Sequence, residues 1–260
     1  MKVVILCGGQ GTRIRDVADN IPKPMIPVGG YPIIWHIMKY YSLFGHNEFI
    51  LCLGHQGKAI KDFFLNYEFN TSDFTMQLGH KESVVFHNKS EEKDWNITFA
   101  ETGEKAMTGA RVRKIKKYIG ADETFMLTYG DGLSDVNIDE LIQYHKNHGR
   151  TLTLTGVRPP GRFGEIMCTN EGVISEFNEK PQSVEGRING GFFVCDKRLF
   201  DYLDAGDDLV FEKDPMMKLV NDQQLMQFNH DGFWQPMDTY REYVLLNELY
   251  DKNKAAWKKW

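Results

Sequence analysis

Residues 1–13 read MKVVILCGGQGTR, and this stretch decides the fold. The apolar run at residues 3–6 leads directly into glycines at positions 8, 9 and 11. A short apolar run of this kind is typical of a strand buried in a parallel sheet, and the glycines allow the backbone to turn sharply after it. We therefore predict a central strand at residues 3–6 with a glycine loop at its carboxyl end.

The rest of the chain repeats this alternation. Helical spacing of apolar residues covers 33–44, 59–67, 110–118 and 138–147, and apolar runs that indicate buried strands lie at 49–53, 125–128 and 152–156. Strands that alternate with helices favour a parallel sheet with helices on both faces. The predicted fold class is α/β, with a Rossmann-like, doubly wound mixed sheet.

Two stretches depart from this alternation. Short strand-like runs at 75–78, 83–86 and 96–99 predict a small inserted antiparallel β element, and residues 164–178 and 190–194 predict strands of a second lobe. No linker rich in proline, glycine or serine divides the chain. We expect one domain, 1–260, with a first lobe at about 1–135, a second lobe at about 136–242 and a helical C-terminal segment at 243–260.

Composition limits the possible functions. The chain has 260 residues, of which 42% are hydrophobic, and its 36 acidic and 31 basic residues give a net charge of −5. A mildly acidic chain without a long apolar run gives no support for nucleic-acid or membrane binding. The cysteines at 7, 52, 168 and 195 are far apart and lie within or beside apolar segments. This pattern predicts free buried thiols and a reducing, cytoplasmic environment.

The glycine loop is a candidate phosphate site. The backbone N–H groups of Gly8, Gly9 and Gly11 can approach a phosphate chain closely, and the Arg13 guanidinium suits its oxygens. Lys23 stands between two prolines, which stiffen the loop that carries it. The alternative for the glycines alone is a tight strand-to-helix turn. A dinucleotide fold and a P-loop are both disfavoured, because the third glycine, the ribose acid and a Gly-Lys-Ser/Thr sequence are missing.

Two aspartates are candidate metal ligands. Asp131 follows the predicted strand at 125–128, and Asp238 lies far downstream in GFWQPMDT at 232–239. Ligands of open α/β sheets bind at the carboxyl ends of the strands, and Mg²⁺ prefers hard oxygen ligands. Sequence spacing alone leaves open whether the two carboxylates meet, and Asp-Gly is also a common turn pair.

With these residues identified, the whole chain resembles the sugar-nucleotide pyrophosphorylase superfamily, and within it the cytidylyltransferases that act on glucose 1-phosphate. Eight motifs carry the resemblance in order: KPM and VGG within 23–30, WHIMKYYS at 35–42, TG with MTGAR within 102–111, TYGDG at 128–132, PPGRFG at 159–164, NEKP at 178–181, INGGFFV at 188–194 and GFWQPMDT at 232–239. The implied fold is the nucleotide-diphospho-sugar transferase fold, with a nucleotide-binding part at about 1–135 and a sugar-binding part at about 136–242.

The resemblance also implies roles for particular residues. Arg13, Lys23 and Lys180 would be catalytic, and Asp131 and Asp238 would bind Mg²⁺. The nucleotide would be held by Leu6, Gly8, Gly9, Gly11, Thr12, Arg13, Lys23, Thr102, Gly103, Arg111 and Gly130. The sugar phosphate would be held by Tyr129, Gly164, Glu179, Lys180, Asn189, Gly190 and Trp234.

The implied reaction transfers a cytidylyl group from CTP to α-D-glucose 1-phosphate and gives CDP-glucose and pyrophosphate. The segment 102–111 favours cytosine, because relatives that transfer thymidylyl or uridylyl groups typically have a Gly-Leu-Ala-rich stretch there. Another nucleotide, another sugar 1-phosphate or a catalytically silent nucleotide-binding regulator remain alternatives. The resemblance further implies a cytoplasmic homo-oligomer that serves surface-polysaccharide (O-antigen) synthesis. The inserted strands and the aromatic C-terminus are candidate contact surfaces.

Overall fold

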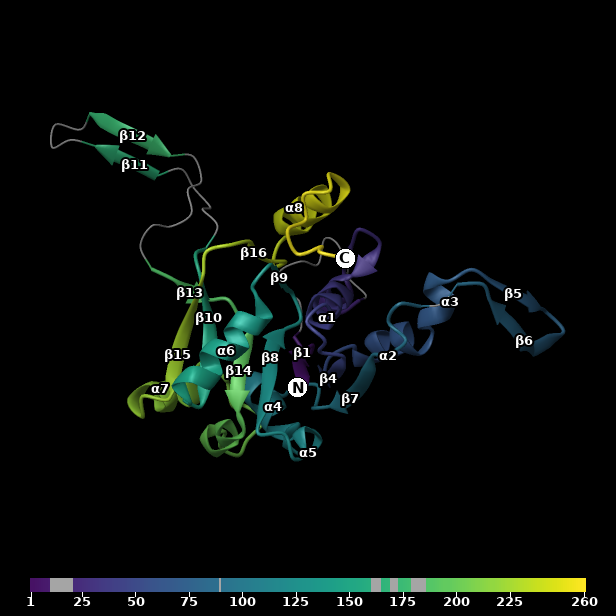
Figure 1. Ribbon diagram of the computed structural model, residues 1–260, viewed down its shortest axis with the longest axis horizontal. Helices are drawn as coiled ribbons and strands as arrows, with labels where there is room; N and C mark the ends of the chain where they lie inside the picture. Colours follow the sequence, from purple (N-terminus) through teal and green to yellow (C-terminus); the bar gives the residue numbers. More distant parts are fainter. Residues whose placement is uncertain (10–20, 89, 160–164, 169–172, 179–185) are drawn as a thin grey trace.

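A computed structural model describes residues 1–9, 21–88, 90–159, 165–168, 173–178 and 186–260. Its main sheet has eight strands in the order β13-β10-β14-β8-β1-β4-β7, with β15 paired to β10 (Figure 1). The strands are β1 (Val3–Leu6), β4 (Glu48–Leu53), β7 (Asn96–Glu101), β8 (Thr124–Tyr129), β10 (Leu152–Val157), β13 (Ile188–Asn189), β14 (Phe193–Asp196) and β15 (Leu225–His230). The predicted strand at 3–6 is confirmed at the centre of the sheet.

The sheet is mixed, as predicted. Strand β1 is parallel to β4 and β8, and β4 is parallel to β7. On the other side of β8, strand β14 runs antiparallel, and β10 is antiparallel to β14 but parallel to β15. The two parts expected at 1–135 and 136–242 share this one sheet, because β8 from the first part pairs directly with β14 from the second.

Alternate residues of β1 pack into different cores, which is why helices cover both faces. Val3 and Ile5 belong to one buried cluster, and Val4 and Leu6 belong to the other. The first cluster includes residues of α1 (Ile33–Ser42), α2 (Gly57–Leu65), α6 (Ile138–His148) and α8 (Tyr240–Asp251). The second includes residues of α4 (Thr108–Lys114), α5 (Lys116–Ile119), η2 (Lys197–Tyr202) and α7 (Asp214–Asn221). The doubly wound α/β class is therefore confirmed.

The inserted β element is smaller than predicted. Strands β5 (Phe74–Gln77) and β6 (His80–Phe86) form an antiparallel hairpin that follows α3 (Tyr67–Thr71) and stands away from the main sheet in Figure 1. The third run, at 96–99, was wrongly assigned to this insertion. It lies in β7, whose parallel pairing with β4 makes it an edge strand of the main sheet. Its alternating pattern fits that position, because only part of an edge strand is buried.

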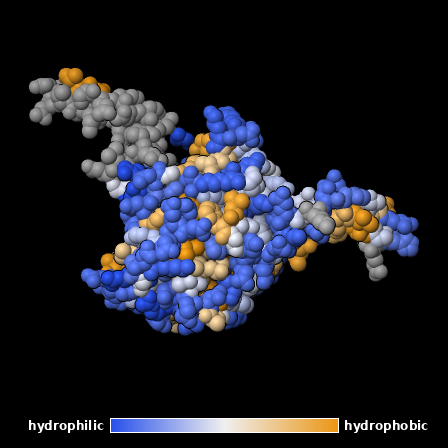
Figure 2. Space-filling view, viewed as in Figure 1, coloured by the Kyte–Doolittle hydropathy of each residue, from blue (hydrophilic) through white to orange (hydrophobic). Residues whose placement is uncertain are grey.

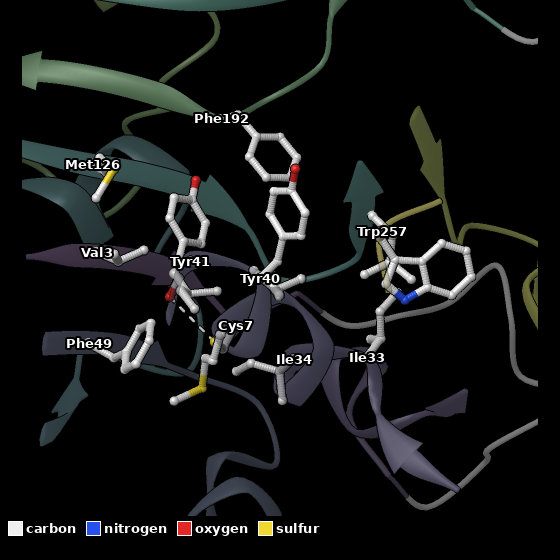
Figure 3. Close-up of a cluster of buried hydrophobic side chains, with 14 of the residues drawn as sticks. Val3, Cys7, Ile33, Ile34, Tyr40, Tyr41, Phe49, Met126, Phe192 and Trp257 are labelled. Carbon is white, nitrogen blue, oxygen red and sulfur yellow. Dashed lines mark hydrogen bonds between the residues drawn. The ribbon is translucent and has the colours of Figure 1, made fainter. Parts of the chain in front are cut away.

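The C-terminal aromatic residues complete a core. Trp257 is fully buried against Phe233 and His36, in the cluster that Figure 3 shows with Ile33 and Tyr40 of α1. Burial of a large aromatic ring removes a large apolar area from water. The expectation that Trp257 lies on a contact surface is therefore wrong, because the chain covers this residue itself.

Three further small sheets complete the fold. They pair β2 (Pro27–Val28) with β3 (Tyr31–Pro32), β9 (Gly132–Ser134) with β16 (Trp234–Pro236), and β11 (Glu165–Cys168) with β12 (Ile174–Asn178). The run predicted at 164–178 therefore contains two antiparallel strands. Cys7, Cys52 and Cys195 are free and buried, as predicted. No helix among the described residues is long and apolar enough to cross a membrane.

Candidate active site

The site lies where the parallel strands β1 and β8 end. The register places Leu6 beside Tyr129, so the glycine loop after β1 and the segment after β8 leave the sheet together. A cavity of about 510 Å³ opens at this edge. It is lined by Leu6, Cys7, Gly8, Gly9, Lys23, Pro24, Glu104, Lys105, Ala106, Met107, Thr108, Arg111, Tyr129, Gly130 and Asp131. Seven of the residues predicted for the nucleotide and metal sites therefore line this one cavity.

Glycine is required at two points of this edge. A Cβ on Gly8 would lie 2.1 Å from Arg111 Cζ, and a Cβ on Gly130 would lie 2.9 Å from the Leu6 carbonyl oxygen. Both distances are too short for real atoms, so the tight approach depends on the missing side chains. The Gly130 N–H also donates to the Leu6 carbonyl at 3.1 Å, which joins the two loops. The glycines shape the cavity as well as the turn.

Asp131 and Asp238 converge despite their distance in sequence. The antiparallel pairing of β9 and β16 sets Pro236 opposite Gly132, and the Met237 N–H donates to the Asp131 carbonyl at 2.8 Å. Asp238 is then fixed by the start of α8, because its own N–H donates to Glu242 Oε2 at 2.7 Å. The short β ribbon therefore brings the two carboxylates to one place, as a shared cation site requires.

Lys23 lies between these carboxylates. Its ammonium group donates to Asp131 Oδ2 at 2.5 Å and to Asp238 Oδ1. Lys23 begins a single 3-10 turn, η1 (Lys23–Met25), between Pro22 and Pro24, and its side chain is 14% exposed. Burial alone would lower the pKa of Lys23, but the two carboxylates outweigh it and raise its pKa above the ordinary value. The ammonium group is therefore held charged at the centre of the site.

Arg111 is almost fully buried beside the glycine loop. Its guanidinium donates to the carbonyls of Gly8 and Leu53, each at 2.8 Å, and to Thr102 Oγ1 at 2.7 Å. Thr102 Oγ1 in turn donates to the Leu53 carbonyl at 2.6 Å. These contacts fix the ends of β1, β4 and β7 relative to one another. Arg111 borders the cavity, but much of its donor capacity is used within the chain.

Four of the predicted sugar-binding residues, Tyr129, Asn189, Gly190 and Trp234, form a second linked group. Asn189 Nδ2 donates to the Tyr129 hydroxyl at 3.2 Å, and Trp234 Nε1 donates to the Gly190 carbonyl at 2.7 Å. Gly190 approaches β10 closely, because a Cβ there would lie 2.5 Å from Val157 Cγ1. Tyr129 belongs both to this group and to the cavity wall, so it stands at the junction of the two predicted substrate sites.

The structure adds one residue that the sequence analysis did not identify. Glu212 accepts from the Tyr129 hydroxyl at 2.6 Å through Oε1 and from Thr108 Oγ1 at 2.7 Å through Oε2. It lies in a turn before α7, 83 residues beyond Tyr129. No local motif marks this position, because its partners become neighbours only in the folded chain.

Six predicted site residues lie outside the described part of the chain. They are Gly11, Thr12, Arg13, Gly164, Glu179 and Lys180. His36 is a fully buried core residue with a hydrogen bond to the backbone. Its Nε2 lies 2.7 Å from the Val28 carbonyl, and burial lowers its pKa to about 4.

Comparisons with known proteins identify the family of the chain. The family model "Nucleotidyl transferase" matches residues 2–253. Glucose-1-phosphate cytidylyltransferases of Salmonella typhimurium and Salmonella typhi are each 45% identical over 260 residues, which cover 100% of both chains. The solved structure of HddC from Yersinia pseudotuberculosis has the same fold, with a TM-score of 0.69 at 22% identity over 96% of this chain and 99% of that one. The chain therefore belongs to the nucleotidyl transferase family.

Proposed function

We propose that this chain transfers a cytidylyl group from CTP to α-D-glucose 1-phosphate and releases pyrophosphate. One observation carries the proposal: Asp131, Asp238 and Lys23 meet beside a cavity that the glycine loop and segment 104–111 enclose. The full-length similarity to two glucose-1-phosphate cytidylyltransferases supports the choice of nucleotide and sugar.

In this reaction, an oxygen of the sugar phosphate forms a bond to the α-phosphorus of the triphosphate. The bond from the α-phosphorus to the oxygen of the departing pyrophosphate breaks at the same centre. The attacking oxygen is already anionic at neutral pH, so no general base is needed. The main tasks are to position two anions that repel each other and to stabilise charge as it moves. The cavity offers positive charge for these tasks, because Lys23, Lys105 and Arg111 line it.

Mg²⁺ fits the two carboxylates. Asp131 and Asp238 already direct one oxygen each at the same cation, the Lys23 ammonium. Among the described residues, no group of three or more His, Cys, Asp or Glu side chains could hold a metal ion alone. Triphosphate oxygens and water would therefore complete the coordination shell, as is usual for Mg²⁺. When bound, the ion would neutralise phosphate charge near the α-phosphorus.

Lys23 would then have to move. An ammonium group and a divalent cation cannot share the same two carboxylate oxygens, because their charges repel strongly at such distances. The side chain would turn toward the triphosphate, where its charge is still useful. The family resemblance implies that Arg13 and Lys180 are the other cations at the phosphates and that Glu179 contacts the sugar hydroxyls.

The exposed hairpin β5–β6 supports assembly as a homo-oligomer. Figure 2 shows hydrophobic residues gathered on this arm, and they include Phe69, Phe74, Met76, Leu78 and Val85. Exposed apolar side chains that gather on a projecting element are typical of a protein–protein contact. We propose that a second copy of this chain covers it, in a cytoplasmic enzyme of surface-polysaccharide synthesis. The three buried free thiols suit a reducing compartment.

The deciding experiment measures pyrophosphate release from four nucleoside triphosphates, each paired with a panel of sugar 1-phosphates and Mg²⁺. We expect turnover to be fastest with CTP and glucose 1-phosphate. Asp131→Asn and Asp238→Asn should each lower kcat at least about a hundredfold, because a placed charge at the reacting phosphate is lost. Asp251→Asn, at the exposed end of α8, is the matched control and should keep full activity.

Two results would reject the assignment. Near-normal rates in Asp131→Asn or Asp238→Asn would remove the metal role of that carboxylate. Nucleotide binding without pyrophosphate release from any pair would instead indicate a catalytically silent regulator. Faster turnover with another triphosphate or sugar would keep the reaction class and change the substrate.

A further inference from the structure

Glu212 joins the two halves of the site. Its carboxylate receives one hydrogen bond from Thr108, at the start of α4, and one from Tyr129, at the end of β8. Thr108 belongs to the segment that borders the nucleotide cavity, and Tyr129 is linked through Asn189 to the predicted sugar side. One side chain therefore contacts both regions at once.

The polypeptide around Glu212 supports the same segment. The Met107 N–H donates to the Asp207 carbonyl at 2.8 Å, and the Ala110 N–H donates to the Leu209 carbonyl at 3.1 Å. The Phe211 N–H donates to Thr108 Oγ1 at 2.9 Å. Segment 107–110 is thus held by the backbone of residues 207–211, and Glu212 extends this support across to Tyr129.

The hydrogen bond to Glu212 determines what the Tyr129 hydroxyl can do. Its single proton is donated to Glu212, and one of its lone pairs accepts from Asn189. Burial and the nearby Glu212 charge both raise the pKa of Tyr129, so the hydroxyl keeps its proton. Tyr129 is therefore fixed in orientation and has no proton left for a ligand. It contributes its ring to the wall between the two substrates.

We propose that Glu212 is a positioning residue that couples the nucleotide pocket to the sugar-phosphate pocket. By holding Thr108 and Tyr129 in one arrangement, it sets the distance between the two bound substrates before they react. An effective nucleophile must lie close to the phosphorus and in line with the leaving group, so a loose wall between the substrates lowers the rate. The inference rests on the proposed function, because it assigns the cavity to the nucleotide and the neighbouring group to the sugar phosphate.

Three single substitutions distinguish the two hydrogen bonds that Glu212 accepts. Thr108→Val should raise the KM for CTP alone, and Tyr129→Phe should raise the KM for glucose 1-phosphate alone. Glu212→Ala should raise both, each on the order of tenfold, because it removes both hydrogen bonds to a charged group. The double variant Glu212→Ala/Tyr129→Phe should have a KM for glucose 1-phosphate no higher than that of the poorer single variant. Both substitutions remove the same hydrogen bond, between Tyr129 and Glu212.

Glu212→Gln is the rescue variant. Its amide can accept from Tyr129 and donate to Thr108, so both KM values should stay near those of the unaltered chain. Glu248→Ala is the surface control, since Glu248 forms an exposed pair with Lys252. Thermal unfolding of every variant is measured alongside the kinetics.

Several outcomes would overturn the proposal. Glu212→Ala could lower the melting temperature with both KM values unchanged, which would make the residue merely structural. A change in only one KM would remove the coupling. A Glu212→Gln variant as impaired as Glu212→Ala would mean that the charge contacts a substrate directly. Failure of the proposed function is distinct, because the unaltered chain would then not turn over CTP and glucose 1-phosphate.

Discussion

The Lys23 ammonium group holds together two carboxylates, one from the middle of the chain and one from its C-terminal part. Without a cation between them, Asp131 and Asp238 would repel each other in a partly buried place, where water screens charge poorly. Lys23 therefore has two opposing effects. It stabilises the geometry of the site, and it would compete with the proposed Mg²⁺ for the same oxygens.

This competition gives a prediction for Lys23→Met. Removing the ammonium takes away the cation that pairs with both carboxylates, so the affinity for a dication should rise at least about tenfold. Electron paramagnetic resonance of free Mn²⁺ measures this affinity without substrates or turnover. Lys58→Met is the control, because Lys58 is 84% exposed on α2.

The same Mn²⁺ measurement on Asp131→Asn tests whether this carboxylate binds the metal. Asp131→Asn should weaken Mn²⁺ binding, and if it does not, the metal site lies elsewhere. Equal or weaker Mn²⁺ binding by Lys23→Met, with Asp131→Asn still impaired, would show that the ammonium and the metal do not compete.

At the scale of elements, Arg111 connects the ends of three parallel strands. Its contacts reach the loop after β1, the last residue of β4 and the residue after β7. A buried guanidinium is costly unless its donors are satisfied, and here backbone carbonyls and Thr102 satisfy them. The glycine loop therefore depends on an α4 residue that lies 103 positions away in sequence.

Two adjacent glycines test this connection. A Cβ on Gly8 would overlap the Arg111 guanidinium, whereas a Cβ on Gly9 has no neighbouring atom within 4 Å. Gly8→Ala should therefore lower the free energy of unfolding by about 1–3 kcal/mol, the usual cost of overpacking. Gly9→Ala should change it by less than about 0.5 kcal/mol. Urea denaturation of both variants measures the difference, and equal stabilities would contradict a fixed Arg111.

At the scale of the whole molecule, stability should fall in mild acid. His36 is fully buried, and its pKa is lowered from 6.5 to about 4 by burial. As the pH falls, the unfolded chain protonates His36 at a higher pH than the folded chain does. The contribution of neutral His36 to the free energy of unfolding is therefore complete above pH 6.5. It is lost as the pH falls from 6.5 toward 4.

The expected loss from His36 is as much as about 3 kcal/mol across that range. Urea denaturation at a series of pH values measures it. His36→Gln removes the titrating ring but keeps a donor for the Val28 carbonyl, so its stability should depend less on pH in this window. His145 is also buried and its pKa is also lowered to about 4, so part of the dependence should remain. An unchanged pH dependence in His36→Gln would contradict the assignment.

Local patterns in the sequence predicted most strands and helices and the candidate glycine loop, Lys23, Asp131 and Asp238, whereas the resemblance to a family supplied the other candidate site residues. The apolar run at 3–6 with its glycines indicated the central strand, because burial on both faces and a tight turn leave a local signature. The run at 96–99 was misassigned because a short strand looks alike in a hairpin and at the edge of a sheet. Trp257 was misjudged for a related reason: composition does not say which chain covers an aromatic residue.

Tertiary structure alone decided which of these residues meet. Asp131 and Asp238 are 107 residues apart, and only the pairing of β9 with β16 brings them to one ammonium group. Glu212 carries no motif, and its contacts with Thr108 and Tyr129 follow from the packing of residues 207–211 against α4. The physical reason is that propensity and periodicity act over a few neighbouring residues, whereas a site needs charges gathered across the chain by strand register and close packing.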